Sequence, residues 1–494
     1  MVSVRGVAVG CVLTGCVIMA APGRALAEAS APAVEVTHGV AAADVDSRSA
    51  LLWARCSEAA TLHVALRAGD GAAERDVTVA VDAAHDYTAS VPVTGLRAGT
   101  EYDYRAWCGA PGGDAGAAAQ GRFRTAPEPG TAVAAAFAWG GDVGGQNVCR
   151  DAAEGYAIFR TIRSRRPDFF VALGDMIYAD APCAAVGRYG NAQIAGPAAP
   201  ATELPGFWAY WRYNRADPQL QALLAATPYY AVWDDHEVVN DFGPQRDVHP
   251  SAPDRHLLPI GRQAFLDYNP LWGATETPPR LYRAVRWGKH LELFLLDTRS
   301  YRDANAAADT APEPKTMLGR EQLHWLKHAL ATSDATWKVV VSSVPMAIPT
   351  GFGARGHDGW ANFDNETGFE RELLGILRDA RDRGVRNMVW ISTDVHFAAV
   401  FRHRPFADDP AFVVYEVETG PLTAGVFPKR GFDATLRPER LFLHPDLDEP
   451  RGTFAQANTW FNFGLLGIDA AGKLRLQIVD GKGTTLYELP LVPR

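Results

Sequence analysis

The sequence predicts two successive domains of different class, an all-β sandwich over residues 34–126 and an α/β domain over residues 131–494. Short runs of alternating apolar and polar residues fill the first segment, which is typical of a β-sandwich. After the turn-forming sequence Pro-Glu-Pro-Gly at 127–130, near-continuous apolar runs alternate with helix-like stretches. That pattern indicates strands buried on both faces between layers of helices. The chain has 494 residues, of which 47% are hydrophobic, so it has enough apolar material for both cores.

Four strands are expected in the β domain. Their sequences are SALLWARC at 49–56, TLHVALRAG at 61–69, DYTASVPVTGL at 86–96 and EYDYRAWC at 101–108. The stretch from Gly95 to Tyr104 resembles the turn and strand of fibronectin type III domains, in which a leucine packs inward before the turn and a tyrosine follows. The resemblance implies a fibronectin III-like sandwich, and it indicates no catalytic role for this domain.

Six strands and four helical segments are expected in the α/β domain. The strands are Val133 to Trp139, Phe169 to Leu173, Tyr229 to Trp233, Leu291 to Leu296, Val339 to Ser343 and Met388 to Ser392. The helical segments are 151–165, 207–226, 319–333 and 366–384. Residues 461–491 return to alternation around three glycines, which predicts a terminal β-meander.

Polar side chains follow most of these strands. In chain order they include Asp142, Asp175, Tyr178, Asp235, His236, Asp297, Arg299, Ser342, Ser343, Asp394 and His396. Because parallel strands place their carboxyl ends at one edge of a sheet, where open α/β folds bind ligands, we expect these groups to converge there.

Four aspartates would then meet in a small volume: Asp142, Asp175, Asp235 and Asp394. Such a concentration of negative charge is prohibitive unless cations lie between the carboxylates. A single aspartate after a strand is ordinarily a helix N-cap or a turn residue, but recurrence after several strands favours a metal pair. A pair of metal ions polarises a phosphoryl group and makes a hydroxide nucleophile from water near neutral pH. Carboxylate ligands suit Fe(III), Ca, Mn or Mg.

The motifs around these residues resemble those of the metallophosphoesterase superfamily. Asp175 and Tyr178 form a G-D-x-x-Y element directly after a buried strand. Together with a fibronectin-like domain in front, the full set of motifs resembles the alkaline phosphatase D, or PhoD-like, family over nearly all of the chain. The motifs are GDMIYAD at 174–180, WDDHEVVND at 233–241, LLDTRSYR at 295–302 and TDVH at 393–396. The fold implied for residues 131–494 is the αββα sandwich of metallophosphoesterases.

The resemblance implies a role for each matching residue. Asp175 would bridge both metals, and Tyr178 would ligate iron as a phenolate, with an ordinary core aromatic as the alternative. Asp235 stands where the superfamily has an asparagine ligand of the second metal. The adjacent His236 would contact phosphate and protonate the leaving group, with a structural histidine as the alternative.

Asp394 and His396 match the terminal pair of the family, one ligand for each metal. Arg299 is a candidate for holding phosphate through its planar guanidinium, and a salt bridge to a nearby acid is its alternative. His357, in GHDGW, is a candidate for lining the pocket or simply for occupying a loop.

The first motif departs from the family. PhoD-like proteins typically carry a cysteine ligand of iron after the first strand of this domain, whereas this chain reads Trp-Gly-Gly-Asp-Val-Gly-Gly at 139–145. Asp142 is the natural substitute. By resemblance the cofactors are Fe(3+) and Ca(2+), and the substitution leaves manganese or zinc as alternatives. Cys149 could supply the missing thiolate, or it could form a disulfide.

Six cysteines are present, and two of them lie in the N-terminal apolar run. The other four are an even number in a chain that carries an export signal, which predicts disulfides. We expect Cys56 to pair with Cys108 and Cys149 with Cys183, because each pair falls inside one proposed domain. No C-x-x-C spacing occurs, so a structural zinc site is a poor alternative.

Residues 1–27 have the features of a bacterial signal peptide. Arg5 supplies the positive charge, residues 6–21 form a short apolar run, and Ala-Leu-Ala precedes Glu28. The chain lacks the twin arginines that the family often uses. The sequence Leu-Thr-Gly-Cys ending at Cys16 resembles a lipoprotein box, so a lipid anchor is an alternative. No later segment is apolar for long enough to predict a transmembrane span, and we expect a secreted, periplasmic or cell-surface protein.

The composition and the absence of two catalytic motifs exclude several classes of protein. The net charge is −9 and only 21% of residues are charged, so no overall basic field exists to hold nucleic acid. The G-x-S-x-G serine elbow is absent. The covalent-histidine phospholipase D motif, H-x-K-x-x-x-x-D, fails at His324, where the lysine comes one position too late.

The sequence therefore predicts a secreted, metal-dependent phosphoric ester hydrolase acting on a small phosphate ester. One alternative is phosphodiesterase or phospholipase D-type activity on phospholipid or teichoic acid. A second is a non-catalytic secreted binding protein, which would not require this set of residue types at strand ends. The sequence indicates no oligomeric state.

Overall fold

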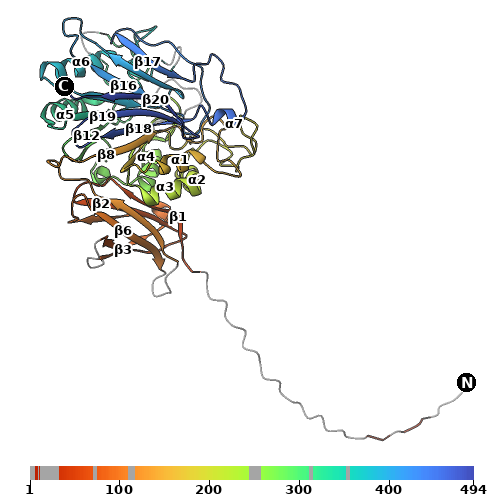
Figure 1. The fold of residues 1–494 in the computed structure, drawn as a ribbon. Coiled ribbons are helices and arrows are strands. Elements are labelled where there is room, and N and C mark those ends of the chain that lie inside the picture. Colours follow the sequence, from red (N-terminus) through yellow and green to blue (C-terminus); the bar gives the residue numbers. More distant parts are fainter. Residues whose placement is uncertain are drawn as a thin grey trace, which may run out of the picture.

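The computed structural model describes most of the chain as a β-sandwich joined to a larger α/β domain (Figure 1). The described residues are 6–8, 10–11, 33–69, 75–109, 117–243, 257–310, 315–351 and 356–494. The signal-peptide and lipoprotein predictions fall largely outside them. Within these ranges, no helix combines the length and the apolar character needed to cross a membrane.

The β-sandwich has three strands facing four, as in fibronectin type III domains. One sheet contains β1 (Val36–Ala43), β2 (Ser49–Cys56) and β5 (Thr88–Thr94). The other has the order β4 (Arg75–Val81), β3 (Ala60–Ala68), β6 (Glu101–Gly109) and β7 (Ala119–Arg124). A short 3₁₀ helix, η1, spans Ala83–His85. The predicted sandwich is confirmed.

Two contacts hold the sandwich together as its sequence suggests. The predicted disulfide between Cys56 on β2 and Cys108 on β6 is present, and it joins the two sheets. Leu96 is buried before the turn, and the Tyr102 hydroxyl accepts a hydrogen bond of 2.9 Å from the backbone N–H of Arg97. The tyrosine therefore ties the strand to the turn that precedes it.

The α/β domain has two sheets packed face to face. The first continues from the sandwich in the order β20-β19-β18-β8-β9-β10-β1-β2-β5. Its α/β members are β8 (Ala135–Gly140), β9 (Phe169–Leu173), β10 (Tyr229–Val232), β18 (Asn462–Ile468), β19 (Leu474–Asp480) and β20 (Thr485–Leu491). Strands β8, β9 and β10 are parallel, and β18 to β20 form the predicted meander.

The second sheet has the order β11-β12-β13-β14-β16-β15-β17. Its strands are β11 (Arg283–Trp287), β12 (Leu291–Leu295), β13 (Trp337–Val341), β14 (Met388–Ser392), β15 (Ala398–His403), β16 (Val414–Glu418) and β17 (Pro438–His444). The run β12, β13, β14 and β16 is parallel. Phe169, Val171, Leu293 and Val339 belong to one apolar core between the two sheets.

Helices cover the outer face of each sheet, which completes the predicted αββα sandwich. The first sheet packs against α1 (Ala157–Ser164), α2 (Leu204–Arg215), α3 (Pro218–Ala226) and α4 (Leu257–Tyr268). The second packs against α5 (Gly319–Thr332) and α6 (Glu370–Asp382). Two short elements, η2 (Trp272–Thr275) and α7 (Phe454–Ala457), lie in connections.

The expected helix at 207–226 is two helices, α2 and α3. Proline cannot continue a helix, and Pro218 begins α3. The Asp217 carboxylate caps the new helix by accepting hydrogen bonds from the backbone N–H groups of Gln219 and Leu220, each 3.0 Å long.

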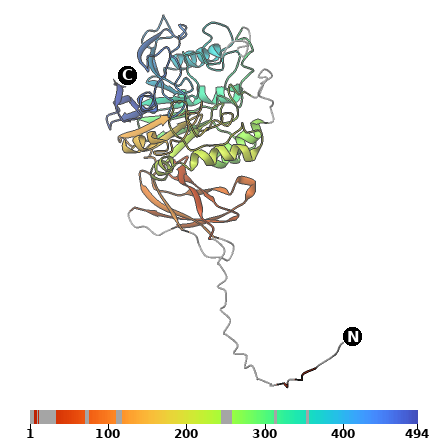
Figure 2. The same cartoon turned by 90° about the vertical axis from the view of Figure 1, so that its right-hand side faces the viewer.

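The sandwich is joined to the α/β domain by a shared sheet. β1 pairs in parallel with β10, with Ala43 opposite Tyr229. The Asp44 carboxylate accepts a hydrogen bond of 2.7 Å from the Arg283 side chain, and the Trp53 indole donates to the Asp267 carbonyl over 2.8 Å. Figure 2 shows the sandwich below the α/β domain, as in the first view. The sequence did not predict this continuous sheet.

Candidate metal centre and active site

The candidate ligands lie where the parallel strands end. Asp142 follows β8, Asp175 follows β9, Asp235 follows β10, and Asp394 and His396 follow β14. Asp142, Asp175, Asp394 and His396 have φ values of 64°, 51°, 78° and 59°. Non-glycine residues rarely adopt this left-handed conformation, and strained backbone of this kind tends to cluster at active sites. Here the sharp turns at the strand ends carry the side chains that the sequence singled out.

Among the described residues, four sets of side chains have ligand atoms within 4.8 Å of one another, close enough to hold a metal ion: Asp142 with Asp175 and His396, Asp175 with Asp235 and His236, Asp234 with Asp235 and Asp394, and Asp235 with Asp241 and Asp358. Asp175 belongs to the first two sets, as expected of a residue between two ions. The predicted convergence of these residues is therefore present in the fold. Asp234, Asp241 and Asp358 are additional members that the sequence analysis did not single out.

Several carboxylate oxygens in this cluster are buried without a hydrogen-bond partner: both oxygens of Asp142, Oδ2 of Asp175 and Oδ2 of Asp394. Burial raises the pKa of each of these three carboxyl groups, and neighbouring acids raise it further. Buried, unpaired carboxylates are costly, so they are normally paired or coordinate metals. The orphaned oxygens and the oxygen-rich donor set fit bound metal ions.

Tyr178 and His396 meet at the Asp142 side of the cluster. The Tyr178 hydroxyl lies 2.7 Å from Nε2 of His396, and that nitrogen lies 3.6 Å from Oδ1 of Asp142. Nδ1 of His396 is 2.5 Å from the Gly425 carbonyl, which can only accept, so Nδ1 carries the proton. Burial lowers the pKa of His396 to about 3. The neutral ring therefore presents the Nε2 lone pair to the cluster, as a metal ligand requires.

His236 is held by an acid that the sequence analysis missed. Its Nδ1 lies 2.7 Å from Oδ1 of Asp180, whose Oδ2 accepts a 2.8 Å hydrogen bond from the backbone N–H of Asn240. Burial alone would lower the pKa of His236, but Asp180 and then Asp235 outweigh it and raise this pKa to about 10. The signal was in the sequence, because Asp180 closes the GDMIYAD motif on the same loop as Asp175.

Arg299 lies behind the cluster in a buried ion-pair network. Its side chain is 0% exposed, with Nε 2.5 Å from Oδ1 of Asp234 and Nη1 2.8 Å from Oδ2 of Asp358. Ser343 also donates to Oδ1 of Asp234, over 2.6 Å. The salt bridge that the sequence left open as an alternative for Arg299 is thus present.

His357 is also buried, and both of its ring nitrogens have partners. Nδ1 lies 3.2 Å from the Thr350 carbonyl and Nε2 lies 2.8 Å from Oδ1 of Asp364. The neighbouring Asp358 is the residue of this segment that reaches Arg299. These contacts fix the loop that follows β13.

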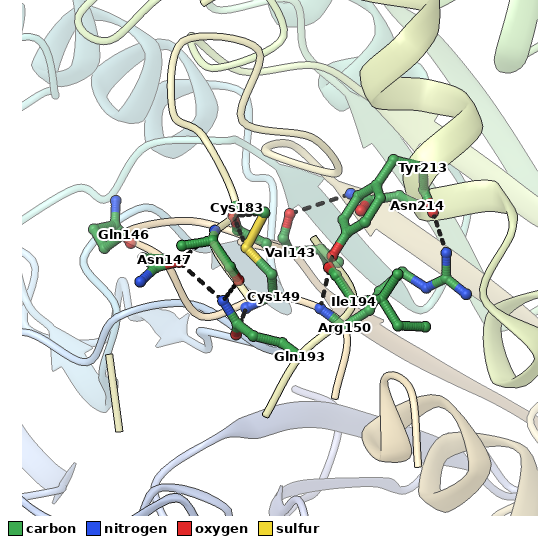
Figure 3. The surroundings of a disulfide bond; sticks show 12 residues. Val143, Gln146, Asn147, Cys149, Arg150, Cys183, Gln193, Ile194, Tyr213 and Asn214 are labelled. Carbon is green, nitrogen blue, oxygen red and sulfur yellow. Dashed lines mark hydrogen bonds between the residues drawn. A yellow bond between two sulfur atoms is a disulfide. The ribbon is translucent and has the colours of Figure 1, made fainter. Parts of the chain in front are cut away.

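The loop that carries Asp142 is tied to the loop that carries Tyr178 by a disulfide (Figure 3). Cys149 pairs with Cys183, as predicted, so the alternative of a thiolate ligand at Cys149 is wrong. The Cys149 backbone N–H also donates to the Gln193 side chain over 2.9 Å. A Cβ atom at Gly145 would lie 2.4 Å from the Tyr178 ring, so only glycine lets the two loops approach this closely.

Two facing sheets with helices outside, and carboxylates at the strand ends, define the metallophosphoesterase class of fold. The chain belongs to the PhoD-like phosphatase family: the model of that family matches residues 137–454, and the model of the family's N-terminal domain matches residues 21–127. The chain is 28% identical to alkaline phosphatase D of Bacillus subtilis (strain 168) over 56% of its own length. The match spans 48%, about half, of that relative.

Two solved structures share the fold. A structure of PhoD superposes with a TM-score of 0.72 at 21% identity, covering 94% of each chain. Purple acid phosphatase PPD1 from seeds of yellow lupin (Lupinus luteus) superposes with a TM-score of 0.56 at 12% identity, covering 92% of this chain and 73% of the other. Identities this low establish the fold alone.

Proposed function

We propose that this protein is an exported, metal-dependent hydrolase of phosphate esters. The observation that carries the proposal is the set of buried, unpartnered carboxylate oxygens of Asp142, Asp175 and Asp394 at the strand ends, beside a histidine held by Asp180. Membership of the PhoD-like phosphatase family and the two disulfides, which form in oxidising compartments, support it.

The residues divide between two metal positions. Asp142, Tyr178 and His396 would hold the first metal, and Asp235 and Asp394 the second, with Asp175 shared. By resemblance to the family the ions are iron(III) and calcium, and with Asp142 in place of a cysteine the first position also suits manganese or zinc. When bound, such a pair polarises the phosphoryl group, activates a water molecule and balances charge on the leaving oxygen.

His236 would supply the proton for the leaving alcohol. In hydrolysis, the oxygen of water forms a bond to phosphorus, the ester P–O bond breaks, and the departing oxygen takes up a proton. Nδ1 of His236 is engaged by Asp180, so Nε2 is the nitrogen that can donate. Asp180 fixes the ring orientation and favours its protonated form, which is the form that a general acid needs.

We propose positioning roles for Arg299 and His357 in place of contact with phosphate. Arg299 is completely buried and pairs with Asp234 and Asp358, so it neutralises charge behind the ligands. His357 uses both ring nitrogens within its own loop region. Its contacts hold the segment that presents Asp358 to Arg299.

Hydrolysis of p-nitrophenyl phosphate and bis-p-nitrophenyl phosphate, before and after chelation, tests the proposal. We expect turnover that chelation abolishes and added metal restores. Faster turnover of the first compound assigns a phosphomonoesterase, and faster turnover of the second assigns a diesterase, the activity that lipid or teichoic acid substrates would need. Turnover that survives complete removal of metal would overturn the proposal.

A further inference from the structure

Glu237 is a buried glutamate beside the metal centre that none of the roles above uses. Its side chain is 0% exposed, and its carboxylate accepts three backbone hydrogen bonds. The N–H groups of Asp175 and Asp234 donate to Oε2 over 3.0 and 2.8 Å, and the N–H of Met176 donates to Oε1 over 2.7 Å. Asp175 and Asp234 are themselves candidate ligand residues, and Met176 is adjacent to Asp175.

These donors belong to two different loops. Asp175 and Met176 follow β9, and Asp234 follows β10. The last backbone hydrogen bond between the two strands runs from the Gly174 N–H to the Val232 carbonyl, over 3.0 Å. Directly after that bond, backbone N–H groups of both loops donate to the Glu237 carboxylate, and further along the Ala179 N–H donates to the His236 carbonyl over 2.9 Å. The Glu237 carboxylate therefore joins the two loops at the point where they leave the sheet.

The segment that carries Glu237 is itself held firmly. The backbone N–H groups of Val238 and Val239 both donate to the Asp235 carbonyl over 2.7 Å, which closes a tight turn. A Cβ atom at Gly261 on α4 would lie 3.2 Å from the Glu237 carbonyl, so the helix packs directly against this turn. A rigid turn of this kind can fix the position of the loops to which it bonds.

On the ligand side, the same two loops meet again. The backbone N–H of His236 donates to Oδ1 of Asp175 over 3.2 Å and to Oδ1 of Asp235 over 3.0 Å. The distance between these two carboxylates therefore depends on how the loops are aligned, and the Glu237 carboxylate is hydrogen-bonded to both loops.

We propose that Glu237 is a positioning residue of the metal centre, whose carboxylate aligns the Asp175 loop with the Asp234–Asp235 loop and so sets the spacing of the ligands. This inference rests on the proposed metal-dependent function. Glutamate suits the task because three N–H donors require an acceptor with two oxygens. In glutamine one of the oxygens becomes an NH₂ donor that faces an N–H group.

The test is the metal affinity of Glu237→Gln, measured by competition with a chelator. A matched control exists in Glu372, a buried glutamate that accepts hydrogen bonds of 3.0 Å from the backbone N–H groups of Met317 and Leu318. We expect Glu237→Gln to weaken metal binding by about 10- to 100-fold, as loss of a residue that supports metal ligands does. Glu372→Gln should lower Tm and leave the affinity at the wild-type value.

Glu237→Asp keeps the negative charge but has a side chain shorter by one methylene group. Its metal affinity tests the inference if Glu237→Gln fails to fold. We expect Glu237→Asp to fold and to bind metal more weakly than wild type. Wild-type affinity in a folded Glu237 variant, or an equal loss of affinity in Glu372→Gln, would overturn the inference. Failure of the wild-type protein to bind metal would instead overturn the proposed function, so the two failures are distinguishable.

Discussion

Replacing His236 by alanine should slow hydrolysis by an amount that depends on the leaving group. The His236 side chain is 12% exposed, and with Nδ1 on Asp180 its Nε2 is the proton donor available to a departing oxygen. An alkoxide leaves poorly without a proton, whereas p-nitrophenolate leaves readily without one. The loss should therefore be large for alkyl phosphates and small for p-nitrophenyl phosphate.

The expected magnitude follows from the role of a general acid. Proton transfer by a positioned side chain contributes about 10²- to 10⁴-fold, which is about 3 to 5 kcal/mol of transition-state stabilisation. We expect a loss of that size in kcat for an alkyl phosphate such as glycerol phosphate. Asp180→Asn should lose roughly 10- to 100-fold, because it keeps the imidazole but no longer favours its charged form. Combining both substitutions should cost little more than His236→Ala alone.

The assay is steady-state hydrolysis of alkyl and aryl phosphates, run beside metal analysis of each variant. Bound metal should stay near the wild-type level in His236→Ala. Equal losses for alkyl and aryl esters would refute the general-acid role. Loss of metal from His236→Ala would make this residue a ligand, and fully additive losses in the double variant would refute the coupling to Asp180.

Three further predictions concern the scaffold. Replacing Cys149 and Cys183 together by alanine should reduce the free energy of unfolding by about 4 kcal/mol, from the entropy of a loop of this length, and unchanged urea denaturation would contradict this. Asp86→Ala removes a buried carboxylate that pairs with Arg55 inside the sandwich and with Arg212 of the α/β domain, and should cost about 3 to 5 kcal/mol in the same assay. Burial alone would raise the pKa of Asp86, but hydrogen bonds from Arg55, Tyr268 and Arg212 lower it. Its stabilising effect is therefore complete at neutral pH and declines as the pH falls below about 4 toward the lowered pKa of the folded state. The stability difference between wild type and Asp86→Ala should shrink in acid, and growth of this difference would contradict the account.

Six strands of the α/β domain could be predicted because each is an apolar run bounded by polar residues, whereas β11, β15, β16 and β17 of the second sheet were not predicted. β9 and β14 begin and end at the expected residues, Phe169–Leu173 and Met388–Ser392. Strands β1, β4 and β7 of the sandwich were not predicted. β1 and β7 contain few large apolar residues, whereas β4 alternates in sequence but is a largely exposed strand at the edge of its sheet. The pairing of β1 with β10 joins residues far apart in sequence, which local patterns do not encode.

The candidate ligands could be predicted because they stand in motifs directly after strands. Asp180, Glu237 and Asp234 were given no role at the site for a different reason. Their partners are backbone N–H groups and the side chains of His236 and Arg299, and these contacts exist only once separate loops have come together. Arg299 shows the same limit of sequence-based prediction. Its positive charge suits either a bound phosphate or a salt bridge to an acid, and only its burial in the fold favours the salt bridge.

The most direct test of the central claim is the metal content of the purified protein, measured by plasma mass spectrometry beside that of Asp175→Asn. Asp175 lies in two of the ligand clusters, so its substitution should affect both metal positions. Asp469→Asn, in the remote turn between β18 and β19, is a suitable control. We predict about two metal ions per chain in wild type and in the control, and loss of both metal and hydrolysis in Asp175→Asn. Wild-type protein that hydrolyses phosphate esters without metal, or an Asp175→Asn variant with full metal and turnover, would contradict the account.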